Sequence, residues 1–133
     1  MREDLTQYGV EETRTPAEVD QLLAAKGTVL MIVNSVCGCA AGRARPAVGM
    51  ALQHAARPNK AATVFAGGDD AAVAHLRANQ LKAFPPSSPS MALFQDGQPV
   101  YMLHRHEIEQ RNPDQIAALL TQAFDRYCVK QTV

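Results

Sequence analysis

Thr28-Val-Leu-Met-Ile-Val-Asn-Ser35 is an apolar, β-branched run that predicts a strand buried on both faces. Cys37-Gly38-Cys39 follows it, and residues 40–57 predict a helix that is kinked or begins late because of Pro46. Two thiols therefore lie between a strand end and a helix start, where unpaired N–H groups and the helix dipole stabilise negative charge. At such a position the pKa of a cysteine falls from about 8.5 to roughly 3.5–7.5, which favours the nucleophilic thiolate.

The spacing of the two cysteines predicts an exchange reaction. Side chains two residues apart in a regular helix point to nearly opposite sides, so a disulfide here needs a local turn that Gly38 allows. We expect a strained and therefore oxidising disulfide, suited to thiol–disulfide exchange. Cys37, nearer the strand, is the expected nucleophile, and Cys39 is the expected resolving thiol. The alternative is a pair of inert thiols in a buried turn.

Size and charge exclude several other classes of protein. The 133 residues suit a single domain, 1–133. Lys plus Arg and Asp plus Glu balance at 13 each, which gives no reason to expect binding to nucleic acid or to an anionic membrane. The apolar run Val29–Val33 is too short to span a bilayer, and the charged residues 1–7 do not resemble a signal peptide. We therefore expect a cytoplasmic protein, and in that reducing compartment closely spaced cysteines are typically catalytic or metal-binding.

Turn and capping signals predict the other elements. These are a helix capped by Thr15-Pro-Ala-Glu18, a strand over 62–66, a helix from Asp69 to about Leu81, strands over 90–94 and 100–104 joined at Asp96-Gly97, and a helix from Asn112-Pro113 to Tyr127. Pro99 places the strand over 100–104 at a sheet edge or delays its start. The order predicts an α/β, thioredoxin-like fold in which helices flank a central mixed β-sheet.

The segment Pro85-Pro-Ser-Ser-Pro-Ser90 by itself predicts a rigid loop. The proline at 89, the apolar strand after it and the glycine turn are, however, similar to the arrangement in the thioredoxin superfamily. This resemblance implies a cis Pro89 beside the active-site cysteines. It also implies that the backbone of Ser88 offers hydrogen bonds to a bound substrate, with Gly38, Ser88 and Pro89 as the substrate-binding residues.

A more specific resemblance covers essentially the whole chain. Its motifs are Asn34-Ser-Val-Cys-Gly-Cys-Ala-Ala-Gly42, Ala44-Arg-Pro46, Phe65-Ala-Gly67, Pro85–Ser90, Ala92-Leu-Phe94, Arg105-His106, and Ala123-Phe-Asp125 with Tyr127-Cys128. Together they resemble the bacilliredoxin family. The resemblance implies removal of bacillithiol from S-bacillithiolated cytoplasmic proteins, with Cys37 and Cys39 matching the two cysteines of the motif. It implies bacillithiol as co-substrate. We expect no bound cofactor and no metal. Gln110 departs from the pattern, because the family usually has glycine there.

Three further sets of residues have two interpretations each. Cys128 is either a thiol packed at a helix end or an auxiliary thiol that resolves or regulates. His104 and His106, on one face if the strand reaches them, are either solvent-facing or metal ligands. The third set, Arg43, Arg45 and Arg105, is either solvated or steers the malate carboxylates of bacillithiol by charge.

Three alternative functions stay open at this point. One is a general protein disulfide reductase or isomerase, which uses the same sulfur chemistry on disulfide-bonded proteins. Another is a metal or iron–sulfur carrier, although two thiols fall short of the four ligands of a closed site unless a homodimer supplies the rest. The last is a non-catalytic interaction module with inert thiols.

Overall fold

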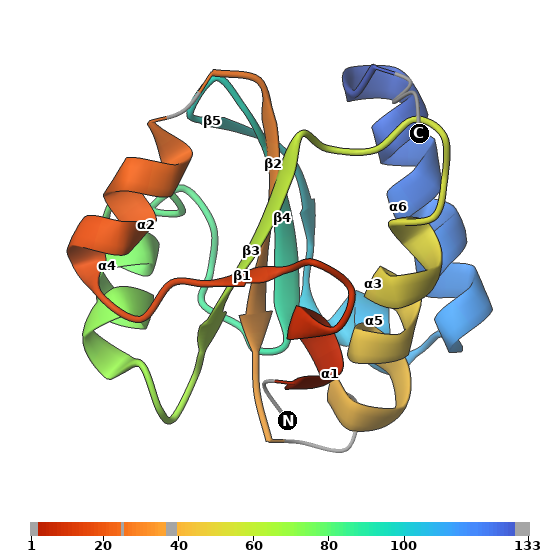
Figure 1. The fold of residues 1–133 in the computed structure, drawn as a ribbon. Coiled ribbons are helices and arrows are strands. Elements are labelled where there is room, and N and C mark those ends of the chain that lie inside the picture. Colours follow the sequence, from red (N-terminus) through yellow and green to blue (C-terminus); the bar gives the residue numbers. More distant parts are fainter. Residues whose placement is uncertain (1–2, 25, 37–39, 130–133) are drawn as a thin grey trace.

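One mixed sheet organises the part of the chain that the computed structural model describes, residues 3–24, 26–36 and 40–129 (Figure 1). Its strands lie in the order β1-β3-β2-β4-β5. Their bounds are Glu11–Glu12 for β1, Thr28–Asn34 for β2, Lys60–Phe65 for β3, Ser90–Gln95 for β4 and Gln98–Leu103 for β5. β1, β3 and β2 run parallel to one another, and β4 runs antiparallel to both β2 and β5. The α/β class and the mixed sheet expected from the sequence are confirmed.

β2 is the central strand, and all seven of its residues are buried. Successive side chains of a strand point to opposite faces. Leu30 and Ile32 accordingly pack into the core on one face of the sheet, whereas Val29, Met31 and Val33 pack into the core on the other. This double burial explains why the sequence of the strand is almost continuously apolar.

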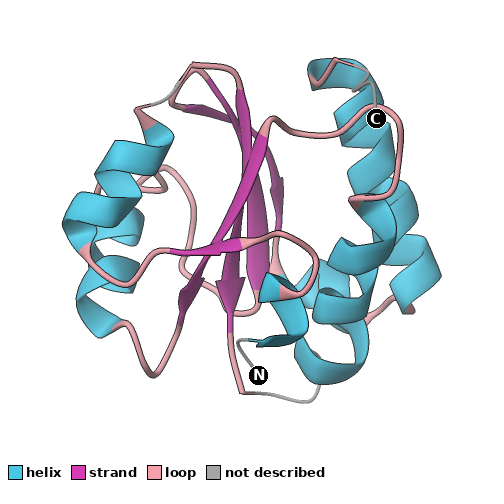
Figure 2. Ribbon diagram, in the orientation of Figure 1, coloured by secondary structure: helices cyan, strands magenta, loops and turns pink. Residues whose placement is uncertain are grey.

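Helices cover both faces of the sheet, as Figure 2 shows. α2 (Pro16–Leu23) and α4 (Asp70–Ala78) contact each other on one face. The other face carries α1 (Glu3–Thr6), α3 (Arg45–Ala51), α5 (Arg105–Glu109) and α6 (Pro113–Tyr127), with the closest helix packing between α3 and α6. Among the described residues, no helix combines the length and the apolar character that crossing a membrane requires.

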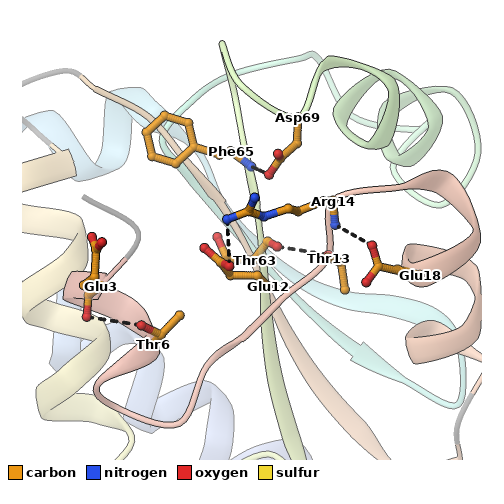
Figure 3. A network of polar contacts seen from close by, with 9 residues as sticks. All are labelled: Glu3, Thr6, Glu12, Thr13, Arg14, Glu18, Thr63, Phe65 and Asp69. Atoms are coloured by element: carbon orange, nitrogen blue, oxygen red, sulfur yellow. Dashed lines mark hydrogen bonds and ion pairs between the residues drawn. The ribbon is translucent and has the colours of Figure 1, made fainter.

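A polar network fastens the segment between β1 and α2 to the sheet (Figure 3). Thr13 donates both its N–H and its hydroxyl to the carbonyl of Thr63 in β3, at 2.8 and 2.9 Å. Arg14 pairs with Glu12 at 3.0 Å, and its N–H donates to the carboxylate of Glu18 at 3.2 Å. The Thr13 bonds fix this segment against β3, and the Arg14 contacts join β1 to the start of α2.

The predicted helix over 40–57 is wrong in extent. A π-helix, η1, covers Ala40–Ala44, and α3 then ends at Ala51. The late start is confirmed, because Pro46 occupies the first turn of α3, where its missing N–H costs no hydrogen bond. The edge position of Pro99 is also confirmed, but β5 starts before it, at Gln98, because an edge strand tolerates a residue without a donor.

Candidate active site

The cysteine motif follows the carboxyl end of β2 in the chain. Asn34 and Ser35 are buried, whereas Val36 is 66% exposed, so the chain leaves the core at that residue. Cys37, Gly38 and Cys39 lie outside the described residues, and their predicted roles stay predictions. The motif is thus joined on one side to the end of the central strand and on the other to η1.

η1 replaces the regular helix start that the sequence predicts after the motif. In a π-helix each N–H bonds to the carbonyl five residues earlier, so the first N–H groups have no partner within the segment. Short π-helical segments are frequent at functional sites. The sequence predicts that unpaired N–H groups of an α-helix follow the thiols. In the structure the segment after the motif is the π-helical turn η1, which continues into α3.

The loop containing Pro89 lies beside the carboxyl end of β2, the end from which the cysteine motif follows. Ser90, the first residue of β4, lies opposite Val33 in the antiparallel register. The peptide bond between Ser88 and Pro89 is cis, as the superfamily resemblance implies. The topology therefore brings Pro89 to the end of the strand from which the cysteine motif follows.

Two arginines from different helices hold this loop. Arg77 of α4 donates through Nη2 to the carbonyl of Ser87 at 3.2 Å, and the Ser90 hydroxyl donates to the same oxygen at 2.9 Å. Arg105, at the start of α5, donates through Nη1 to the carbonyl of Ser88 at 3.1 Å, and its backbone N–H donates to the Ser87 hydroxyl at 3.3 Å. The carbonyls that precede Pro89 are thus fixed by charged donors.

Arg45 is buried at the exit of β2, so its interpretation as a solvated side chain is wrong. Its Nη1 donates to Oδ1 of Asn34 at 3.2 Å and to the carbonyl of Ser35 at 3.1 Å. Its Nε lies 3.1 Å from a carboxylate oxygen of Asp4 in α1. Contacts between α1 and α3 and the position of Asn34 at the strand end bury this cation.

The two histidines lie at the end of β5 but do not share a strand face. β5 ends at Leu103, and His104 caps the start of α5, where Glu107 accepts its N–H at 3.0 Å. The rings of His104 and His106 stack with centroids 5.7 Å apart. Among the described residues, no group of three or more His, Cys, Asp or Glu side chains could hold a metal ion.

Cys128 lies beside Thr28, at the end of β2 opposite to Asn34. It caps the carboxyl end of α6 as a half-buried free thiol and packs against the core. Burial raises the pKa of Cys128, and a hydrogen bond with the Thr28 side chain partly offsets the rise. Thr28 begins β2, so about 20 Å of strand separates this thiol from Asn34. The geometry favours packing over an auxiliary role within one chain.

Comparison with known proteins identifies the family. Residues 1–128 match the family described as Disulphide isomerase. A bacilliredoxin of Koribacter versatilis is 51% identical over 129 residues, which cover 96% of this chain and 88% of that protein. A bacilliredoxin of Halalkalibacterium halodurans is 47% identical over 127 residues, which cover 96% of this chain and 87% of that protein. The chain belongs to the bacilliredoxin family.

Solved structures show the fold of this bacilliredoxin-family chain independently. A mutant thioredoxin of Halobacterium salinarum aligns with a TM-score of 0.62 at 16% identity, covering 92% of this chain and 93% of the thioredoxin. The thioredoxin of Fasciola hepatica also gives a TM-score of 0.62, at 15% identity, covering 89% of this chain and 99% of the other. The fold is thioredoxin-like. The bacilliredoxin relatives and this fold together make the protein a thiol–disulfide oxidoreductase.

The departure from the bacilliredoxin pattern at Gln110 does not strain the backbone. Gln110 follows α5 with φ −90° and ψ 0°, a right-handed conformation that any residue adopts. Arg43 of η1 spans this position, because its Nη1 donates to the carbonyls of both Glu109 and Arg111. Arg43 therefore joins η1 to the end of α5.

Sequence reasoning missed Arg77 and the partners of Arg45. Neither arginine lies in a recognisable binding motif. The one local signal is that Arg45 directly precedes Pro46 at a helix start, next to the cysteine motif. Their roles depend on contacts between elements that are distant in the sequence.

Proposed function

We propose that this protein removes bacillithiol from S-bacillithiolated proteins. The observation that carries the proposal is the near-full-length similarity to proteins named bacilliredoxin, in a chain whose Cys-Gly-Cys motif follows the central strand. The position of the Pro89 loop at the same end of β2 supports it, because a substrate disulfide would lie between the loop and the motif.

The proposed reaction has two exchange steps. The Cys37 thiolate attacks the bacillithiol sulfur of the mixed disulfide, which releases the target cysteine as a thiolate and leaves bacillithiol bound to Cys37 through a new S–S bond. The Cys39 thiolate then attacks the Cys37 sulfur, which releases bacillithiol and forms the Cys37–Cys39 disulfide. Both electrons come from these two cysteines, so no resident cofactor takes part. A thiol or dithiol reductant must restore the pair, as a reducing compartment such as the cytoplasm provides.

We assign the substrate groove to Gly38, Ser88 and Pro89. The Ser88 carbonyl already accepts a hydrogen bond from Arg105, which leaves its N–H as the group for a bound backbone carbonyl. No described residue accepts a hydrogen bond from this N–H. Pro89 beside it is buried, which fixes the position of this loop. This arrangement favours an extended target segment paired with the loop in β fashion.

Intact-protein mass spectrometry tests the proposal. The protein is mixed with an S-bacillithiolated protein that has a single cysteine, and the masses of both are followed. The expected result is a free thiol on the target and a bacillithiol adduct on the Cys39→Ala variant. A Cys37→Ser variant should take up no adduct. If neither the wild type nor the Cys39→Ala variant removes bacillithiol from the target, the proposal is wrong.

A second candidate is a general protein disulfide reductase or isomerase. The description of the matching family, Disulphide isomerase, favours it. Rates on a bacillithiolated protein and on the same protein carrying an intramolecular disulfide separate the two functions. Our proposal requires faster reaction with the bacillithiolated form, and faster rearrangement or reduction of the protein disulfide would favour the second candidate.

A further inference from the structure

The charge of Arg45 is poorly neutralised by its partner. Only 4% of Arg45 is exposed, whereas the side chain of Asp4 is 52% exposed. Water therefore screens the carboxylate more than it screens the guanidinium. The guanidinium Nε also makes no hydrogen bond within the described part of the chain, so Asp4 is a neighbouring charge and not a bonded one. Positive potential consequently persists on the side of the Arg45 guanidinium that faces the carboxyl end of β2.

Asp4 is the acidic side chain that the described residues place in ion-pair distance of Arg45, and the charged groups of η1 and α5 have other partners. Arg43 of η1 donates to carbonyls at the end of α5, and Arg105 pairs with Glu109 at 2.5 Å within α5. Glu3, the neighbour of Asp4 on α1, is exposed like Asp4, so water screens its carboxylate as well. Arg45 is the buried cation of this set, and its two hydrogen bonds go to neutral oxygens.

Asn34 gives Arg45 a neutral hydrogen-bond acceptor, but the same amide group buries a donor that has no partner among the described residues. Its Oδ1 accepts from the N–H of Ser35 at 2.9 Å and from Arg45 at 3.2 Å. Its Nδ2, although buried, has no hydrogen-bond partner among the described residues, which is destabilising. A carboxylate would accept the same two bonds without that unpaired donor, but it would neutralise Arg45. The neutral amide of Asn34 therefore leaves the positive charge of Arg45 unneutralised.

We propose that Arg45 is a positioning residue for the exchange reaction. It fixes Asn34 and Ser35, from which the chain runs through Val36 into Cys37, and its charge lowers the pKa of the Cys37 thiol. The inference rests on the proposed nucleophilic role of Cys37 but does not require bacillithiol as the substrate.

The test measures the pKa of Cys37 in full-length protein with Cys39→Ala and Cys128→Ala, which leaves one thiol. Alkylation by iodoacetamide is followed by intact mass as a function of pH. Arg45→Gln should raise the apparent pKa by on the order of one unit, so that alkylation well below the pKa slows about tenfold. Arg126→Gln, an equal change of charge on the exposed face at the end of α6, is the matched control and should leave the pKa unchanged.

Two further variants separate electrostatics from disruption of the fold. Asp4→Asn removes the partial counter-charge and should lower the apparent pKa of Cys37, the opposite shift to Arg45→Gln. Asn34→Asp should raise it while the protein stays as stable to heat as the parent, because the carboxylate keeps both hydrogen bonds. If Arg45→Gln does not fold, these two variants alone decide.

The inference is overturned if Asp4→Asn and Asn34→Asp shift the pKa in the same direction, or if both leave it unchanged. Because alkylation does not involve bacillithiol, the predicted shifts in a protein that fails to remove bacillithiol would refute the proposed function and leave this inference standing.

Discussion

Cys128 should be unable to resolve a mixed disulfide on Cys37 within one chain. It lies against Thr28, and the six residue steps from Thr28 to Asn34 span about 20 Å of extended strand. A disulfide needs Cα atoms closer than about 7 Å. The chain leaves the sheet after β2 at the end opposite to the carboxyl end of α6, as Figure 1 shows. We therefore expect the effective concentration of Cys128 at Cys37 to be near zero.

The comparison that checks this uses Cys39→Ala and the double variant Cys39→Ala/Cys128→Ala. Both are incubated with a bacillithiolated protein at low micromolar concentration, and the adduct on Cys37 is quantified over time by intact mass. Without Cys39 the intramolecular attack is absent, so the adduct should accumulate in both variants. We expect the yield and lifetime of the Cys37 adduct to agree within about twofold between the two variants, because they differ only in a Cys128 thiol that is too distant to attack the adduct.

Trapping in the double variant alone would refute the reasoning, because it would mean that Cys128 reaches Cys37. A repeat at tenfold dilution distinguishes the route. A loss of adduct that slows on dilution indicates Cys128 of a second molecule, whereas a loss independent of concentration indicates attack within one chain and contradicts the position of Cys128 at the start of β2.

Three other results are expected. Cys37 should alkylate fastest near neutral pH, with an apparent pKa below that of a free cysteine, and faster labelling of Cys128 would contradict both its raised pKa and the assignment of the nucleophile. A hydrogen bond from His75 lowers the pKa of Asp20, so this pair stabilises the fold above the ordinary carboxyl pKa and loses that effect as pH falls through the lowered value. The difference in Tm between wild type and Asp20→Asn should therefore vanish in acid. A difference in Tm that grows in acid would exclude the pair as its cause. Leu30→Ala empties a fully buried position in the middle of β2 and should cost about 2–5 kcal/mol of unfolding free energy in a urea titration, whereas a loss below about 1 kcal/mol would mean that the core closes around the gap.

Elements with complete local signals could be predicted from the sequence. Asn112 accepts the N–H of Gln115 at 2.9 Å, and Gln115 accepts the N–H of Asn112 at 3.0 Å, so the start of α6 is determined within four residues. Asp96 and Gly97 both take positive φ, as the hairpin between β4 and β5 requires. α1, β1 and α5 have only two to five residues each, too few for hydrophobic periodicity, and packing against longer elements determines them.

The charged groups at the exit of β2 and around the Pro89 loop could not be predicted, because contacts between distant elements place them there. An arginine at a helix start is by default solvated, and the position of Arg45 directly before Pro46 does not indicate which groups its side chain contacts. Its burial requires α1 to pack on α3 and β2 to end at Asn34, each determined by apolar contacts elsewhere. Arg77 likewise reaches Ser87 only because α4 packs beside the Pro89 loop. Cysteine spacing thus predicts the reaction, whereas the charges at the exit of β2 depend on the assembled fold, and the opposite pKa shifts expected for Asp4→Asn and Arg45→Gln test that dependence.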